Sequence, residues 1–247
     1  MKKQLFFLLA LCMVCGVSAG CQANKEAERV AVSTNNGSRV VNDIEKFNQL
    51  VLEGIGTVDI VQSDKAPFVE IDAPEEYLDK IIVKSRNGRL TISYEKNSKL
   101  WNPKNKDYHF VVGVNELQLI KNQGVGHISA EALHADKLQI VNAGVGAIDI
   151  NALKATLINV KNEGTGLITL AGDVDAAGYD NEGVGKIDAQ KVAAQRVEAV
   201  NEGTGSIVLT ANQSLKASVD GVGNITYYGS PKEKKFSRGG LGKIVSK

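Results

Sequence analysis

The sequence predicts an all-β protein that folds as a parallel β-helix with coils of about 19–20 residues. A Gly-x-Gly pair recurs at nearly constant intervals, with its first Gly at positions 124, 144, 164, 183, 203, 221 and 240. An Ile stands four residues after the first Gly in every copy. Apolar and polar residues alternate on both sides of the glycines, as in "LQIVNAGVGAIDINAL", which is the period of a strand. A strand pattern that returns at this interval without hairpin turns is typical of a solenoid.

Each repeat is expected to form one coil, and successive coils stack about 4.8 Å apart, so that like residues lie on like residues. The Ile column then fills the core. A second column is predicted to form an internal ladder of amide hydrogen bonds and consists of Asn122, Asn142, Asn162, Asn181 and Asn201. The glycines are predicted to form the corner, where φ is positive or a Cβ atom would clash; the best-defined are Gly164, Gly166, Gly183, Gly185, Gly203 and Gly205.

The glycine-rich motif does not have the spacing of a nucleotide-binding or calcium-binding loop. The string closest to a P-loop, at 239–244, lacks both the required interval and the hydroxyl residue. A calcium β-roll needs nine-residue repeats, about half the interval found here. The pattern therefore specifies architecture and implies no cofactor.

A column of carboxylates precedes the first Gly of four copies and comprises Glu163, Glu182, Glu202 and Asp220. Stacked carboxylates repel one another unless they are solvated, protonated or share a cation. The favoured interpretation is a row of solvated, outward-facing side chains. The alternative is a weak ladder of divalent cations, and the sequence does not decide between them.

The repeats divide a single predicted domain, 41–247, into two parts. Residues 115–247 form regular coils, whereas 41–114 contain less regular alternating segments with an Asn-Gly turn at "RNGR". The basic segment 230–240 is expected to interrupt the last coil.

The N-terminus predicts export and a lipid anchor. Residues 1–20 combine two lysines, a ten-residue apolar run and small residues before Cys21, which is the pattern of a lipoprotein signal peptide. Cys21 would carry the lipid, and the polar residues 21–40 would form a flexible tether. The expected location is the bacterial cell envelope, at the outer membrane. The alternative is a plain secretory signal in which Cys21 is incidental.

Composition excludes several functional classes. The three cysteines, Cys12, Cys15 and Cys21, all lie at or before the predicted cleavage point, so the mature chain has no disulfide and no free thiol for catalysis or metal binding. Removal of residues 1–20 leaves 27 basic and 28 acidic residues, a balance that gives no argument for a nucleic-acid partner.

Candidate catalytic groups are few. The histidines are His109, His127 and His134, and none has a sequence neighbour that indicates a triad or a metal site. Asp59, Asp149 and Asp188 are expected at solvent-facing strand positions. Because the coils between 115 and 230 hardly vary in length, no long loop can wall a cleft. The sequence therefore predicts no catalytic residues and no metal site, with a polysaccharide lyase or hydrolase as the alternative.

One insertion-like segment offers candidate ligand-binding residues. The string "EKNSKLWNPKNKDYHF" contains the only Trp, and the candidates are Trp101, Tyr108, Lys99 and Lys104. An exposed aromatic ring beside cations suits a sugar or an anionic polymer. The alternative is a flap whose Trp packs on the solenoid.

The chain resembles the auto-transporter adhesin, head GIN domain family, a family of unknown function. The resemblance is carried by "IEKFNQLVLEGIGTVDIVQ", by "VEIDAPEEYLDKIIVKSRNGRLTISYE", by "HFVVGVNELQLIKNQGVGHI" and by the G-x-G-x-I coils that follow. It implies a right-handed β-helix in a cell-envelope protein and no established activity. We therefore expect a non-enzymatic binding or adhesion module. Its expected partners are the membrane through the lipid anchor, a glycan or protein at the cell surface, and a second copy of the chain in a homo-oligomer.

Overall fold

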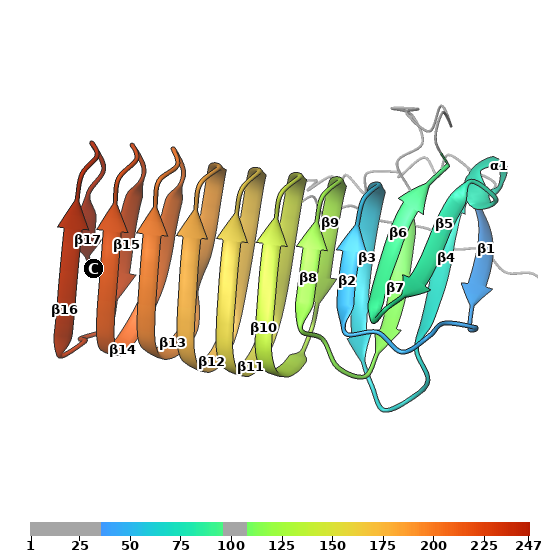
Figure 1. Ribbon diagram of the computed structural model, residues 1–247, viewed down its shortest axis with the longest axis horizontal. Helices are drawn as coiled ribbons and strands as arrows, with labels where there is room; N and C mark the ends of the chain where they lie inside the picture. Colours follow the sequence, from blue (N-terminus) through green and yellow to red (C-terminus); the bar gives the residue numbers. More distant parts are fainter. Residues whose placement is uncertain (1–35, 96–107) are drawn as a thin grey trace, which may run out of the picture. The chain divides into compact units, whose positions relative to one another are not determined.

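The computed structural model describes residues 36–95 and 108–247, and within them one continuous hydrogen-bonded sheet of 17 strands winds into a β-solenoid (Figure 1). The first strands are β1 (Asn36–Val41), β2 (Gln49–Leu52), β3 (Ile55–Gln62), β4 (Phe68–Pro74), β5 (Ile81–Arg86), β6 (Arg89–Tyr94), β7 (His109–Val114), β8 (Leu119–Asn122) and β9 (Val125–Ala130), with the short helix α1 (Glu75–Leu78) between β4 and β5. The later strands are β10 (Leu133–Asn142), β11 (Val145–Asn162), β12 (Thr165–Asn181), β13 (Val184–Asn201), β14 (Ser206–Val219), β15 (Asn224–Tyr228), β16 (Glu233–Arg238) and β17 (Ile244–Ser246).

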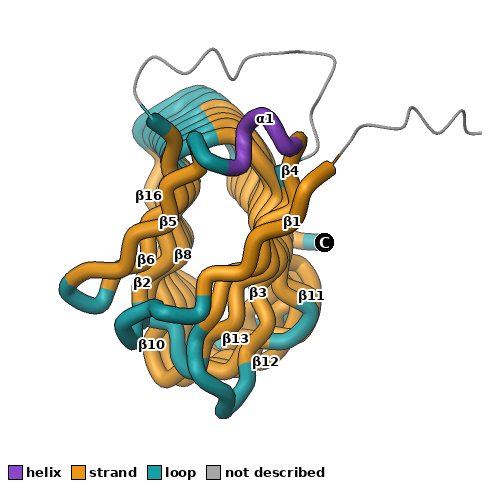
Figure 2. Tube along the Cα trace, turned by 90° about the vertical axis from the view of Figure 1, so that its right-hand side faces the viewer, coloured by secondary structure: helices purple, strands orange, loops and turns teal. Residues whose placement is uncertain are grey.

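The coils from β8 onward are parallel and in register, which confirms the predicted parallel β-helix. Ile148 pairs with Ile168, and Asn142 pairs with Asn162, so each repeat lies directly on the one before it. Figure 2 looks along the solenoid and shows successive coils lying behind one another. The long strands bend within one coil, and the register between β11 and β12 shifts at that bend, between Ile150 and Leu153.

The N-terminal part departs from the parallel pattern. The pairs β1–β4, β4–β7 and β5–β6 are antiparallel, and the β5–β6 hairpin turns at Asn87 and Gly88, both with positive φ. This is the geometry that the Asn-Gly signal predicts. The folded part also begins earlier than expected, because β1 occupies residues that the sequence assigns to the tether.

Two columns of side chains fill the interior. The Ile residues at the corner, from Ile128 to Ile225, are fully buried. The five Asn residues of the predicted ladder are also fully buried, and each donates a side-chain hydrogen bond to the next along 122, 142, 162 and 181, at 2.8–3.0 Å. Asn201, the last acceptor, donates to the carbonyls of Gly205 and Asn224 instead. Buried amides are therefore all paired, as a low-dielectric interior requires.

Glycine is needed at the corner because coils approach closely there. At Gly146, φ is +146°, and a Cβ atom would lie 1.8 Å from the carbonyl oxygen of Gly126 in the coil before it. An L-residue would be strained by its backbone and would also collide with the adjacent coil.

The basic segment near residue 235 does not interrupt the solenoid. Residues 233–238 form β16, which pairs in parallel with β14, so the expected interruption is wrong. Lys234, Phe236 and Arg238 take the register positions of the buried Leu215, Ala217 and Val219. The pattern of inward apolar residues changes here, while the backbone pairing continues.

Candidate functional site

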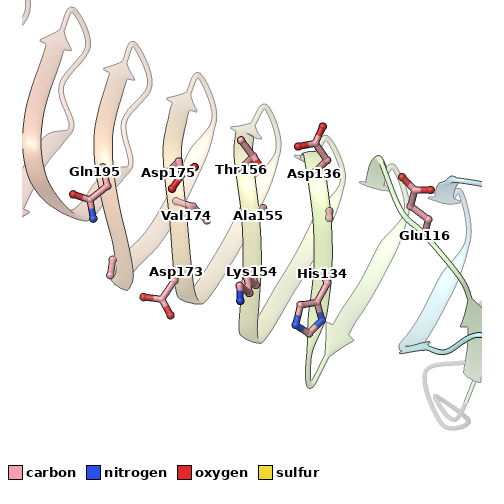
Figure 3. A pocket seen from close by; sticks show the side chains of 12 residues that line it. Glu116, His134, Asp136, Lys154, Ala155, Thr156, Asp173, Val174, Asp175 and Gln195 are labelled. Carbon is pink, nitrogen blue, oxygen red and sulfur yellow. The ribbon is translucent and has the colours of Figure 1, made fainter.

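An open groove of about 630 Å³ runs across four successive coils, where β10 to β13 bend (Figure 3). Its floor is a column of small residues, in which Ala135 pairs with Ala155 and Ala155 with Val174. Because these side chains face the core, the groove lies between the outward-pointing side chains on either side of them. Ala135 and Ala155 are partly buried, and both pack against the hydrophobic core.

Two rows of polar side chains border this floor. Residues on either side of a floor residue point outward, because side chains alternate along a strand. One row consists of His134, Lys154 and Asp173, and the other of Asp136, Thr156, Asp175 and Gln195, with Glu116 at one end. The rows repeat at the coil spacing of about 4.8 Å, so the groove offers polar side chains of differing charge at regular intervals.

The end of the groove near β8 is fixed by the side chain of Gln62. Its Oε1 accepts a hydrogen bond from the backbone N–H of His134 at 2.7 Å, and its Nε2 donates to the carbonyls of His134 and Asn115 at 2.9 and 3.0 Å. This bridge joins β3 to the start of β10 and the loop before β8. The coil that carries His134 is therefore held rigidly at this end.

The groove is acidic and solvated. Four carboxylates, those of Glu116, Asp136, Asp173 and Asp175, line it together with the cation of Lys154. All of these side chains are exposed, and none makes an ion pair with another residue in the described part of the chain. Exposed polar groups of this kind can donate to and accept from a polyhydroxyl chain without first breaking internal bonds.

A second polar cluster lies on β3, β7 and β9. Nε2 of His109 lies 2.7 Å from Oδ2 of Asp59, and Ser129 Oγ donates to the other oxygen of the same carboxylate. Desolvation by burial raises the pKa of Asp59, but the hydrogen bonds from Ser129 and His109 and the nearby imidazoles outweigh it and hold the pKa below its usual value. The Asp59 carboxylate, and not an imidazole, accepts the hydrogen bond of the Ser129 hydroxyl, so the order of contacts differs from a Ser-His-Asp triad, in which the imidazole contacts the hydroxyl.

A similar pair follows on the same face. Nε2 of His127 lies 2.7 Å from Oδ2 of Asp149. Both His–Asp pairs are roughly half exposed. Among the described residues, no group of three or more His, Cys, Asp or Glu side chains is arranged to hold a metal ion.

The model of the "putative auto-transporter adhesin, head GIN domain" family matches residues 46–231, three quarters of the chain. The chain belongs to this family. A crystal structure of a "putative adhesin" from Bacteroides fragilis is 32% identical, covers 87% of this chain and 98% of its own, and superposes with a TM-score of 0.83. No curated protein matches the chain.

Two more distant solved structures have the same fold. A "putative lipid binding protein" from Parabacteroides distasonis is 23% identical, with a TM-score of 0.70 over 87% of this chain and 98% of its own. A "putative adhesin" from Parabacteroides merdae is 22% identical, with a TM-score of 0.65 over 85% of this chain and 95% of its own. The family and these neighbours are named for adhesion or lipid binding and not for an enzymatic activity, and an adhesin family fits a surface or exported protein. No helix in the described part of the head GIN chain is long and apolar enough to cross a membrane.

Tyr108, the one predicted ligand-binding residue in the described part of the chain, does not line the groove. Trp101, Lys99 and Lys104 lie outside the described residues. Tyr108 is only 2% exposed, and its ring packs edge-on against Tyr94 at 5.7 Å between centroids. Burial and the neighbouring Tyr77 raise the pKa of Tyr108 to about 12. Tyr108 is thus a core residue of this head GIN domain, and the prediction that it offers an exposed ring is wrong.

The sequence-based predictions do not pair Asp59 and Asp149 with histidines. Asp149 lies 22 residues after His127, which is one coil plus two positions and therefore a diagonal neighbour on the same face. Alignment of the repeats contains that signal. His109 and Asp59 are 50 residues apart across the irregular part, where no repeat relates β3 to β7.

The carboxylate column at the corner has a cation among its neighbours. Lys161 Nζ lies 2.8 Å from Glu182, 3.2 Å from Glu163 and 3.8 Å from Asp180. A lysine therefore neutralises part of the column. Whether Glu163, Glu182, Glu202 and Asp220 also bind a divalent cation stays an open prediction.

Proposed function

We propose that this head GIN protein is a non-enzymatic adhesion-type module of the cell envelope, which binds an extended polymer along the groove on β10 to β13. The observation that carries the proposal is the pair of polar rows supplied by four successive coils. A rigid, regularly spaced row of hydrogen-bonding groups matches a ligand that is itself regular, such as a glycan chain. The adhesin names of the family and of its structural relatives support this assignment.

The exposure of the groove favours binding over catalysis. A glycoside hydrolase needs a carboxylic acid that stays protonated in a desolvated site beside a second carboxylate. The carboxylates of Asp136, Asp173 and Asp175 are exposed on an open surface. New reducing ends or unsaturated products after incubation with a panel of polysaccharides would reject the non-enzymatic function and support the alternative of a polysaccharide lyase or hydrolase.

The envelope location rests on the N-terminal signal. In this proposal Cys21 carries the lipid, residues 22–35 tether the solenoid, and the protein is held at the outer membrane. Cells fed an alkyne-tagged palmitate should label the wild-type protein and not Cys21→Ser. Protease treatment of intact cells should then report whether the solenoid faces the medium. Unchanged labelling of Cys21→Ser would reject the anchor without affecting the groove.

The binding experiment compares the groove with an equal change elsewhere. Purified protein is applied to an array of immobilised glycans and matrix proteins, alongside a variant with Asp173→Asn and Asp175→Asn. The matched control is the double variant Asp43→Asn and Asp64→Asn, which removes two exposed carboxylates outside the groove. We expect the groove variant to lose at least about tenfold in affinity for the polymer that the wild type selects, because two hydrogen-bonded carboxylates contribute more than 1.4 kcal/mol. Equal affinities of all three proteins would reject the groove as the binding site.

The insertion that contains Trp101, Lys99 and Lys104 is a second proposed contact region. Trp101→Ala should weaken binding on the same array and leave the melting temperature unchanged. A lowered melting temperature with unchanged binding would assign Trp101 to packing.

A further inference from the structure

A second hollow, of about 490 Å³, lies beyond the bend on the C-terminal halves of β12, β13 and β14, with β16 at its edge. It is formed by a local lack of side chains. Along one row, Leu157 is followed on the next strands by Ala176, Arg196 and Ser214. Along the neighbouring row, Asn159 is followed by Gly178 and Glu198. The small residues Ala176, Gly178 and Ser214 surround Arg196 and leave its guanidinium beside open space.

Gly178 is not required by the backbone. Its φ is not positive, and a Cβ atom would meet only the flexible side-chain oxygen of Asn159, at 2.7 Å. At the corner glycines, by contrast, the obstacle is a backbone carbonyl of the adjacent coil, as at Gly146. The glycine at 178 therefore shapes the surface and is not needed to allow the coils to stack.

Cations gather around this hollow. Its lining includes Arg196, Lys216, Lys234 and Lys235, against the carboxylates of Glu198 and Glu233. Lys216 forms an ion pair with Glu198. The exposed side chain of Arg196 has no ion pair or hydrogen bond with any residue in the described ranges.

Two of the cations are neighbours by register. Lys216 on β14 pairs with Lys235 on β16, so their Cα atoms lie about 4.8 Å apart. Like charges directly beside each other destabilise a sheet. Arg196 pairs with Ser214, two residues before Lys216, which places it diagonally next to this pair. Three cations on three successive strands would be relieved by an anionic ligand with more than one charge.

We propose that this hollow binds the carboxylate or sulfate groups of an acidic polysaccharide. Arg196 is the main anion-binding side chain, because its planar guanidinium can donate two parallel hydrogen bonds to such a group. Lys216 and Lys235 bind the next charge along the chain, one or two coils away. Gly178 and Ala176 leave room for the sugar ring beside Arg196. This site lies on the strands past the groove and does not depend on the proposed role of that groove.

A polysaccharide fits the hollow better than the other polyanions. The protein as a whole carries a net charge of +1, so it lacks the broad positive field that draws nucleic acids. Among residues 36–95 and 108–247, no aromatic side chain lines the hollow, so they offer bases no stacking platform. The cations are confined to one end of one face, whereas binding to a membrane surface depends on an extended basic patch.

The test measures affinity for three polymers by isothermal titration calorimetry at low salt: polyuronate chains of alginate, dextran sulfate and neutral dextran. We expect the wild type to bind the two charged polymers and not neutral dextran, with weaker binding as salt is raised. Arg196→Gln should lower the affinity at least about tenfold, the usual worth of a charged hydrogen-bonded contact. Gly178→Gln should lower it similarly by filling the hollow without changing any charge.

The matched control is Lys137→Gln. Lys137 is exposed and lies in the same row as Leu157, Ala176 and Arg196, three coils away from Arg196. Lys137→Gln removes one positive charge, as Arg196→Gln does, and should change the affinity for the charged polymers less than about twofold. Far-ultraviolet circular dichroism and the melting temperature verify that each variant is folded.

Three outcomes would overturn the proposal. The first is an equal loss of affinity in Arg196→Gln and Lys137→Gln, which indicates a diffuse charge effect. The second is binding of neutral dextran as tightly as of the charged polymers. The third is binding to phosphatidylglycerol vesicles without binding to either acidic polysaccharide. Loss of acidic-polysaccharide binding in Arg196→Gln, with the groove variant unaffected, would support this site whatever the outcome for the groove.

Discussion

The Nδ2 atom of Asn162 donates to Oδ1 of Asn181 at 2.8 Å, and both side chains are fully buried. Asn142 donates to Asn162 in the same way, so all hydrogen bonds of the ladder run in one direction along the solenoid. Each interior Asn is therefore an acceptor for one coil and a donor to another. This relationship joins five successive coils by buried side-chain hydrogen bonds, in addition to their backbone pairs and apolar contacts.

Replacement of one interior ladder residue should cost more than the bond it removes. Asn162→Ala leaves the amide of Asn142 without an acceptor and the oxygen of Asn181 without a donor, both buried. We expect the free energy of unfolding to fall by roughly 2–4 kcal/mol. Urea denaturation measures it, and Asn159→Ala, on the exposed side of the same strand, should change it by less than about 0.5 kcal/mol. Equal midpoints for the two variants would mean that the ladder does not stabilise the solenoid.

The repeat predicts the core because the core is periodic. The Ile column, the Asn column and the corner glycines each occupy one register position, so a local pattern fixes a contact between coils. The antiparallel strands β1, β4 and β5 follow no such rule. Of their pairings, the Asn-Gly turn predicts only that of β5 with β6. Where periodicity ends, at β16, the inward positions hold Lys234 and Arg238, and the sequence suggests an interruption that the backbone does not make.

The groove and the hollow are harder to predict because they depend on side-chain size. Ala135, Ala155 and Val174 read as ordinary positions of a strand, and Gly178 reads as one glycine among many. These residues indicate a groove or a hollow only when the strand register shows which of them are neighbours on adjacent coils. Tyr108 illustrates the reverse case: its place in a polar insertion suggests exposure, yet its ring lies against Tyr94 in the core.

Two tyrosines should respond in opposite directions to loss of the hydroxyl group. The hydroxyl of Tyr179 is buried and has no hydrogen-bond partner among the residues that the structure describes, and burial raises its pKa. Tyr179→Phe should therefore stabilise the protein by about 1 kcal/mol, because an unsatisfied polar group leaves the core. Tyr94 donates to the carbonyl of Ile55, so Tyr94→Phe should destabilise by about 1 kcal/mol. Urea midpoints of the two variants provide the comparison, and a loss of stability in Tyr179→Phe would mean that a buried water satisfies its hydroxyl.

The Asp59 carboxylate should make stability fall in acid. Its folded-state pKa lies below the ordinary value of 3.8, so its contribution is present above that value and is lost as pH falls through the folded pKa. Asp59→Asn removes the charged partner of His109 and should cost about 1 kcal/mol or less at neutral pH, since the side chain is 45% exposed. The difference from wild type should shrink below pH 4. Urea titrations at a series of pH values measure this difference, with the exposed Asp64→Asn variant as the control. A constant difference at all pH values would assign the effect to geometry and not to charge.

Asp180 should affect the pH dependence of stability in the opposite direction to Asp59. Desolvation by burial and the charge of Glu182 raise its pKa, and Lys161 only partly offsets them. Because the folded-state pKa lies above the unfolded value, the ionised carboxylate opposes folding, and stability falls as pH rises from about 4 through the folded pKa. Asp180→Asn should therefore stabilise the protein at neutral pH, by less than about 1 kcal/mol because its side chain is 39% exposed. Lys161 keeps its contacts with Glu163 and Glu182, at 3.2 and 2.8 Å, so the substitution removes repulsion without isolating the lysine.

The stability gained by Asp180→Asn should disappear below pH 4, where Asp180 is protonated in both states, and should decrease at high salt, which screens the neighbouring carboxylates. A loss of stability at neutral pH would show that attraction to Lys161 outweighs repulsion along the column.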